Sequence, residues 1–275
     1  PSEVKRGAVV AEFNALMNSD LGQKLTNCLF DEGDLTWFRD AGVDPVNGID
    51  RVAMIDDNAV VSGDFSRVPW DTFGNVAKDY GPRAKLYESG DGRSFAVWNG
   101  QMLITGRDEA SIKATLDRLE NGGPQQGAPV LDDSMAYGEV YGLVNSGFIA
   151  SMLEKQDPRL AQLMRQAADS MQLHMDVSHD VGMVADVKPT DPATADELRR
   201  ALGAAVSLAR MRAVAEGNQD EASILDLARV HGAEEGGGFR LEAGVPYEIM
   251  AKGLDECVAE RARAKLRKAD AGVAE

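Results

Sequence analysis

The chain reads AKLYESGDGRSFAVWNG from Ala84 to Gly100 and ARVHGAEEGGGFRLEAG from Ala228 to Gly244. Each segment holds a β-prone run, a glycine-rich acidic turn and a second β-prone run, and a helical pattern follows later in each half. Recurrence of this kind indicates an internal duplication. It predicts how the protein is built, and it makes the junction between the two copies the first place to look for a binding site.

The two copies are predicted at 1–120 and 135–275, joined by a linker at 121–134. The linker begins NGGPQQGAP, and its Gly, Pro and Gln residues offer little apolar surface to bury. A length of 275 residues suits two domains of ordinary size. The second copy has a basic C-terminal helix end, with cations at Arg261, Arg263, Lys265, Arg267 and Lys268.

Local patterns predict the same order of elements in both halves: strand, helix, hairpin, helix, strand. In the first half, residues 51–55 and 59–65 form a hairpin, Pro69 begins a helix that extends through Ala77, and Asn99-Gly100 makes a tight turn. In the second half, two β-prone runs flank Ser178-His179-Asp180, and a long helix runs from Pro192 to Glu216.

This order of elements is that of the split β-α-β-β-α-β, or ferredoxin-like, unit. The predicted fold class is therefore α+β, with two ferredoxin-like repeats. We expect two antiparallel sheets, each covered by helices, with an extra hairpin and a terminal helix in each repeat.

Charge and hydropathy limit the classes of partner. The net charge is −16, and a surface of that sign repels phosphate backbones, so nucleic acid is not an expected partner. No apolar run reaches the length of about 18 residues that a transmembrane helix needs. The expected partner is another protein or a small ligand.

Two groups of polar residues could carry chemistry. Asp56, Asp57 and Asp64 lie around the first hairpin, where carboxylates could bind Ca²⁺ or act in acid–base catalysis, but Asp-Asp-Asn is also what a tight turn favours.

His174 and His179, with Asp176 nearby, suggest a metal site. However, a spacing of five along a strand puts the two rings on opposite faces. With no recognisable phosphate loop, dinucleotide fingerprint, HExxH pair or GxSxG elbow, we assign no catalytic, cofactor-binding or metal-binding residues.

The two cysteines, Cys28 and Cys257, allow two interpretations. A disulfide between them would tie the two halves together and imply an oxidising compartment. Two unrelated buried thiols are the alternative. The sequence does not choose between them, because cysteine connectivity does not follow from sequence.

The segment AGVDPVNGIDRV, from Ala41 to Val52, is followed by a predicted hairpin and by a Gly-x-Phe at Gly63–Phe65. This pattern resembles the first half of uncharacterised bacterial envelope proteins and lipoproteins. The resemblance implies an exported protein, periplasmic or associated with the cell envelope through a leader ahead of Pro1, and it supplies no catalytic residues. A cytoplasmic protein is the alternative.

Together these features predict a non-enzymatic envelope protein that binds a protein or ligand through a cleft between the repeats. The alternative hypothesis is a hydrolase that uses carboxylates on the hairpins. A deep pocket in which Asp56, Asp64 or His174 converge would favour the hydrolase.

Overall fold

The computed structural model describes residues 7–29, 42–44, 47–55, 58–73, 76–88, 94–121, 137–155, 157–232 and 237–272. Twelve strands lie in this part of the chain: β1 (Gly7–Ala11), β2 (Ile49–Ile55), β3 (Asn58–Gly63), β4 (Val76–Tyr80), β5 (Ala84–Glu88), β6 (Ser94–Trp98), β7 (Met102–Thr105), β8 (Val140–Asn145), β9 (Ser170–Asp176), β10 (Val181–Val187), β11 (Arg229–Gly232) and β12 (Phe239–Val245).

Eight α-helices and a short 3₁₀ helix accompany the strands in the described residues. They are α1 (Phe13–Asn18), α2 (Asp20–Leu29), the 3₁₀ helix η1 (Trp70–Phe73), α4 (Glu109–Asn121), α5 (Ser146–Leu153), α6 (Pro158–Ala167), α7 (Pro192–Glu216), α8 (Gln219–Leu227) and α9 (Tyr247–Gly272). The fold class is thus α+β, as expected. None of these helices is both long and apolar enough to cross a bilayer.

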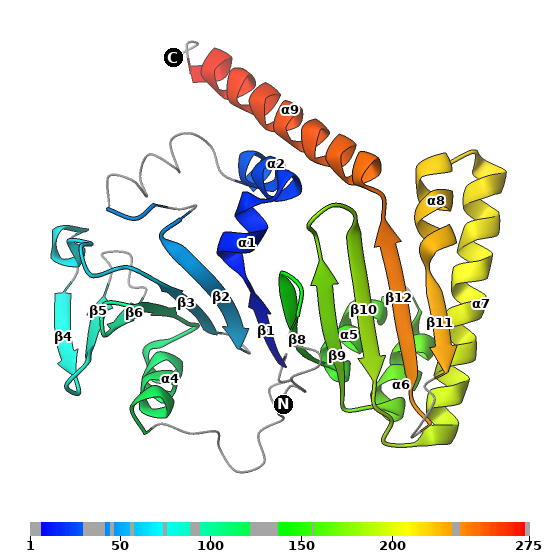
Figure 1. Cartoon of the computed structure of the whole chain (residues 1–275), viewed down its shortest axis with the longest axis horizontal. Helices are drawn as coiled ribbons and strands as arrows, with labels where there is room; N and C mark the ends of the chain where they lie inside the picture. The colour runs from blue at the N-terminus through cyan, green and yellow to red at the C-terminus, as the bar shows by residue number, and fades with distance from the viewer. Residues whose placement is uncertain are drawn as a thin grey trace.

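The strands form one continuous sheet rather than two. Its order is β11-β12-β10-β9-β8-β1-β2-β3-β7-β6-β5-β4, and every neighbouring pair is antiparallel (Figure 1). The first strand of each half meets the other at the centre, where β1 and β8 pair from Gly7 opposite Val144 to Ala11 opposite Val140. The two halves therefore share a backbone hydrogen-bond ladder.

The expected ferredoxin-like arrangement does not form. In a split βαβ unit, one helix connects two parallel strands. Here a pair of helices, α1 and α2, connects β1 to β2, and another pair, α5 and α6, connects β8 to β9. In each half the strand after the helix pair runs antiparallel beside the strand before it.

Local sequence signals create the breaks between these helices. Ser19 separates α1 from α2, and its hydroxyl oxygen accepts a hydrogen bond from the Gly22 N–H at 2.9 Å. Asp157 caps α6 by accepting from the Leu160 N–H at 2.9 Å, and Pro158 is the first residue of that helix.

Helices cover different faces of the sheet in the two halves. Val60 and Ile104 pack with α4, whereas Val144 and Val187 pack with α5, α6 and α7. The cross-strand pairs run from Ile104 through Val60, Ala53 and Val10 to Tyr141, and cross-strand partners share a face. Because Tyr141 and Val144 point to opposite faces, α4 lies on one face and α5 to α7 on the other.

The helix that follows the last strand differs between the halves. After β7, α4 folds back over the sheet and buries Ile112 and Leu116. After β12, α9 instead leaves the sheet and packs on α2 of the first half (Figure 1). The side chains of Lys265, Arg267 and Lys268, predicted in the basic helix end, lie outside the described side chains, as does the linker apart from Asn121.

Candidate functional site

The acidic candidates that the structure describes are turn-forming residues. Asp64 accepts hydrogen bonds from the Ser66 hydroxyl at 2.6 Å and the Ser66 N–H at 3.1 Å, and the pKa of its carboxyl is lowered by these bonds. Asp176 makes the same arrangement with Ser178, which likewise lowers its pKa. Asp56 and Asp57 lie outside the described residues.

The two candidate histidines lie apart. His174 is 5% exposed on β9, with the Tyr137 ring 3.9 Å away between centroids. His179 is at the tip of the β9–β10 hairpin, where its ring stacks on Tyr247 at 5.5 Å, next to Asp180, which accepts from the Tyr247 N–H. The described residues contain no cluster of three metal-ligand side chains.

The environment of His174 opposes its protonation. Burial lowers the pKa of its imidazole, and this effect prevails over the nearby Asp186 carboxylate, which acts in the opposite direction. Its Nδ1 atom is buried and has no hydrogen-bond partner among the described residues. Strands β2, β1 and β8 separate β9 from β3, so His174 and Asp64 do not converge as the hydrolase hypothesis needs.

The junction between the halves is a continuous strand ladder at the level of the sheet. Beside the β1·β8 ladder, Glu12 accepts hydrogen bonds from the Tyr141 hydroxyl at 2.7 Å and from Arg51 Nε at 2.8 Å. Burial raises the pKa of Glu12, but the bonds from Arg51 and Tyr141 outweigh it and lower the pKa overall. Strand pairing and a shared carboxylate thus join the two halves at the level of the sheet.

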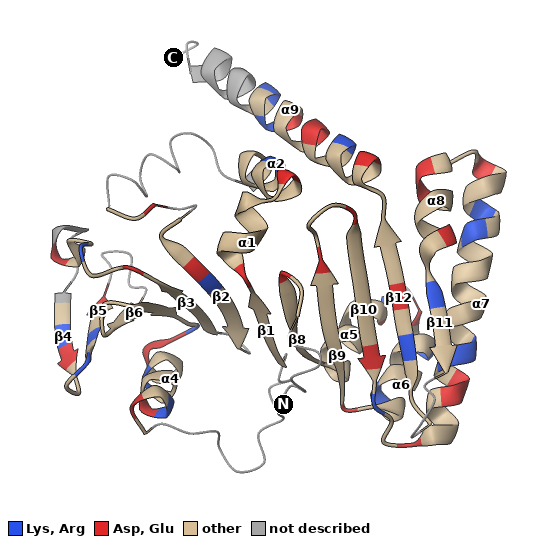
Figure 2. Cartoon of the chain, in the orientation of Figure 1, with Lys and Arg blue, Asp and Glu red and all other residues tan. Residues whose placement is uncertain are grey.

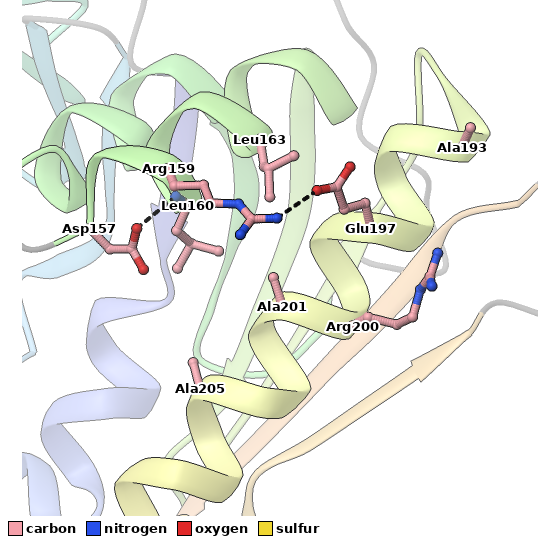
Figure 3. Close-up of a pocket in the computed structure, with 9 residues that line it drawn as sticks. All are labelled: Asp157, Arg159, Leu160, Leu163, Ala193, Glu197, Arg200, Ala201 and Ala205. Carbon is pink, nitrogen blue, oxygen red and sulfur yellow. Dashed lines mark hydrogen bonds and ion pairs between the residues drawn. The ribbon is translucent and has the colours of Figure 1, made fainter.

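A groove instead lies between α6 and α7, with a volume of about 550 Å³ (Figure 3). Leu160 and Leu163 from α6 face Ala201 and Ala205 from α7 across it. The groove is open because α7 presents alanines here, and their small side chains do not fill the space between the helices. Its charged rim is made of Asp157, Arg159, Glu197 and Arg200.

The rim of the groove is held by ion pairs. Arg159 donates to Glu197 at 3.0 Å across the groove (Figure 3). Arg200 pairs with Asp196 one turn away at 2.8 Å. These side chains are largely exposed, so each pair contributes little to stability and can be rearranged by a bound partner.

Beyond the groove, α7 carries large apolar side chains in contact with solvent. Leu208 is 65% exposed, Met211 62% and Val214 59%. At 25 residues, α7 is about 37 Å long, well beyond the length of the seven-residue strands it accompanies. We call Ala201, Ala204, Ala205 and Leu208 the α7 stripe; it continues the groove along the helix.

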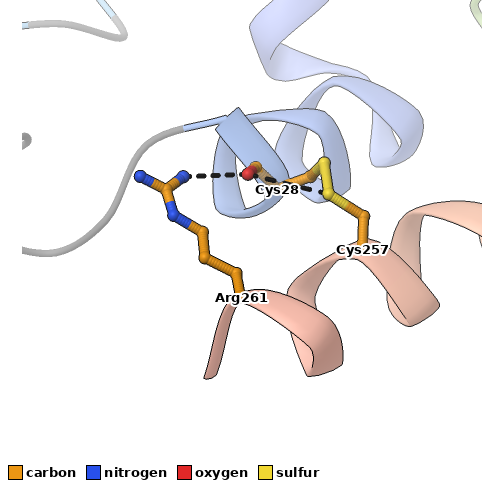
Figure 4. Close-up of a disulfide and its surroundings, with 3 residues drawn as sticks. All are labelled: Cys28, Cys257 and Arg261. Atoms are coloured by element: carbon orange, nitrogen blue, oxygen red, sulfur yellow. Dashed lines mark hydrogen bonds between the residues drawn. A yellow bond between two sulfur atoms is a disulfide. The ribbon is translucent and has the colours of Figure 1, made fainter. Parts of the chain in front are cut away.

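A disulfide joins the two halves at a position away from the groove (Figure 4). Cys28 of α2 is bonded to Cys257 of α9, with 5.6 Å between their Cα atoms. Arg261 donates to the Cys28 carbonyl at 2.8 Å, and Lys24 pairs with Asp255 at 2.6 Å. Of the two interpretations that the sequence allowed, the structure has the bridge.

No protein-family model, curated protein or solved structure matches the chain. The α7 stripe was not among the sites predicted from the sequence. A signal was present, because Leu208 does not follow the three- and four-residue series of Leu198, Leu202 and Val206 that faces the core. An apolar residue off the buried face of a long helix is a candidate contact residue.

Proposed function

We propose that the protein is an exported, non-enzymatic binding protein that docks an amphipathic helix in the groove between α6 and α7. The observation that carries this proposal is the exposure of Leu208 and Met211, which follow Ala201 and Ala204 at a spacing of seven residues and so lie on the side of α7 that borders the groove. Exposed apolar patches on folded proteins mark interaction sites, and an amphipathic helix in an apolar groove is a recurring mode of recognition.

Energetics favour a partner at this position. Complete burial of one leucine side chain contributes about 1.5 to 3 kcal/mol. Leu208 and Met211 on the groove side of α7 thus offer a useful driving force, while the charged rim at Arg159 and Glu197 can orient the partner.

The disulfide supports the proposal of export. Disulfides persist in oxidising environments and are rare in reducing ones, so the Cys28–Cys257 bridge favours a periplasmic or envelope location over the cytoplasm. The resemblance of the Ala41–Val52 region to bacterial envelope proteins agrees with this compartment.

Strand order supports the proposal that the two halves are copies of one unit, although the unit is not ferredoxin-like. Outward from the centre, the order is β1-β2-β3-β7-β6 in one half and β8-β9-β10-β12-β11 in the other. By this correspondence β6 and β7 match β11 and β12. The similar segments at 84–100 and 228–244 are therefore offset by one strand, because the first of them spans β5 and β6.

Fluorescence anisotropy would test the docking function. The probe is a labelled, alanine-based helix of about 20 residues with leucines along one face, long enough to be helical when bound. We expect it to bind the native protein and to lose affinity at least about tenfold for Ala205→Trp, which fills the groove. The matched control is Ala262→Trp, at an exposed alanine of α9. Absence of binding, or equal affinity for Ala205→Trp, would contradict the proposal.

A further inference from the structure

We infer that the helix docked in the groove is α7 of a second copy of this chain, running antiparallel to the first. This inference rests on the proposed docking function and names its partner. It follows from the order of residues along the α7 stripe and the charges that flank it.

The α7 stripe is complementary to itself when it is reversed. A two-fold axis between Ala204 and Ala205 places each residue opposite the one equally far on the other side of this point. Leu208 then faces Ala201 of the partner subunit, and each Ala204 faces an Ala205. Such reciprocal contacts are the rule for a two-fold interface.

Side-chain size suits a close contact between these helices. Alanines at the centre allow two helices to approach, and Leu208 projects as a knob toward the space beside Ala201. Leu208 is 65% exposed and the groove at Ala201 and Ala205 is open. Each copy therefore presents on its surface both the projecting leucine and the space that would receive the leucine of the other copy.

Charge selects the antiparallel direction. The same axis sets Glu197 of each copy opposite Arg212 of the partner subunit, so the dimer contains this pair of opposite charges twice. A parallel pair would instead set Glu197 against Glu197 and Arg212 against Arg212, and like charges in contact suppress a wrong arrangement. Figure 2 shows the uncharged middle of α7 lying between charged bands toward its two ends.

Both charged residues can take a second partner. Glu197 accepts from Arg159 at 3.0 Å and Arg212 donates to Glu216 at 2.7 Å, all on exposed side chains. A carboxylate has several acceptor positions and a guanidinium has five N–H donors, so the pair across the interface adds to the existing bonds. Glu216 would also lie opposite Ala193, in the first turn of the partner helix, where a negative charge is favourable.

Sedimentation velocity on the full, disulfide-bonded chain tests the inference over about 1 to 100 µM, the range of weak to moderate dimers. We expect a concentration-dependent dimer. Leu208→Glu should be monomeric over the whole range, whereas Met152→Glu, which changes a residue 62% exposed on α5, should remain dimeric. Far-UV circular dichroism checks that each variant is folded.

A charge exchange tests the alignment. Glu197→Arg and Arg212→Glu should each weaken the dimer at least about tenfold, and the double variant should recover affinity, because the reciprocal pairs are restored in reverse. A native protein that is monomeric at the highest concentration, a dimer that survives Leu208→Glu, or a double variant that recovers nothing would overturn the inference. If such a monomer still binds the probe helix in the groove, self-pairing fails and the docking function stands; if it binds neither, both fail.

Discussion

His174 is a buried histidine whose charge the fold does not compensate. Its ring lies under Tyr137, it is 5% exposed, and burial lowers the pKa of its imidazole below the usual value. The unfolded chain therefore binds a proton at this residue at a higher pH than the folded chain does. Stability contributed by neutral His174 is complete above the unfolded pKa of about 6.5 and is lost as the pH falls from there toward the folded pKa.

The direction of this pH dependence of stability gives a test of the environment of His174. Between pH 7 and pH 5 the free energy of unfolding of the native protein should fall, and His174→Phe, which keeps an aromatic ring under Tyr137, should show a smaller fall. Urea denaturation at a series of pH values measures the difference. An unchanged slope in His174→Phe would show that His174 does not carry the effect.

At the scale of elements, the β6–β7 turn is where sequence and structure agree most closely. Asn99 and Gly100 both adopt positive φ, at 53° and 68°, as a tight Asn-Gly turn requires, and the Gln101 N–H closes the turn by donating to the Trp98 carbonyl at 3.0 Å. The predicted β2–β3 and β9–β10 hairpins and the long helix from Pro192 to Glu216 also form.

A substitution at this turn tests its contribution. Gly100→Val puts a branched side chain at positive φ, and a Cβ atom there would lie 3.3 Å from Ser66 Cα. We expect it to lower the free energy of unfolding by about 1 to 3 kcal/mol. The control is Gly232→Val, on the edge strand β11, where a Cβ atom meets nothing within 4 Å. Equal losses at both positions in thermal or urea unfolding would contradict the role of the turn.

Strand β4 shows where local patterns mislead. A helix was predicted from Pro69 through Ala77, but only the 3₁₀ helix η1 forms, ending at Phe73, and Val76–Tyr80 is a strand paired with β5. Gly74 and Asn75, both turn-forming residue types, stand between the two elements in the sequence. The prediction of a helix through Ala77 was wrong because pairing with β5 prevails over the weak propensity of a short segment.

For the whole molecule, the disulfide closes a loop that contains most of the chain. Cys28 and Cys257 are 229 residues apart, so the bridge restricts the unfolded state strongly. We expect reductant to lower the free energy of unfolding by about 2 to 4 kcal/mol. The variant with Cys28→Ser and Cys257→Ser should show the same loss without reductant and no further loss with it. Equal urea midpoints for the oxidised and reduced protein would contradict this expectation.

The sequence by itself determined the α+β class, the acidic composition and several local turns and helix starts. These features depend on residues close together in the chain, such as Asn99-Gly100 or the cap at Asp157. The helical series of α7 was visible too, including the residue that does not fit its buried face.

Only the tertiary structure decided which strands are neighbours and which surface stays open. Nothing in the local sequence of β1 or β8 predicts that their edges pair, yet this pairing turns two expected sheets into one. Likewise, Leu208 is 65% exposed because the described elements that pack on α7 cover its other face, on which Ala213 is buried. Edge pairing and helix coverage depend on surfaces that meet across long sequence separations, and short-range patterns do not encode them.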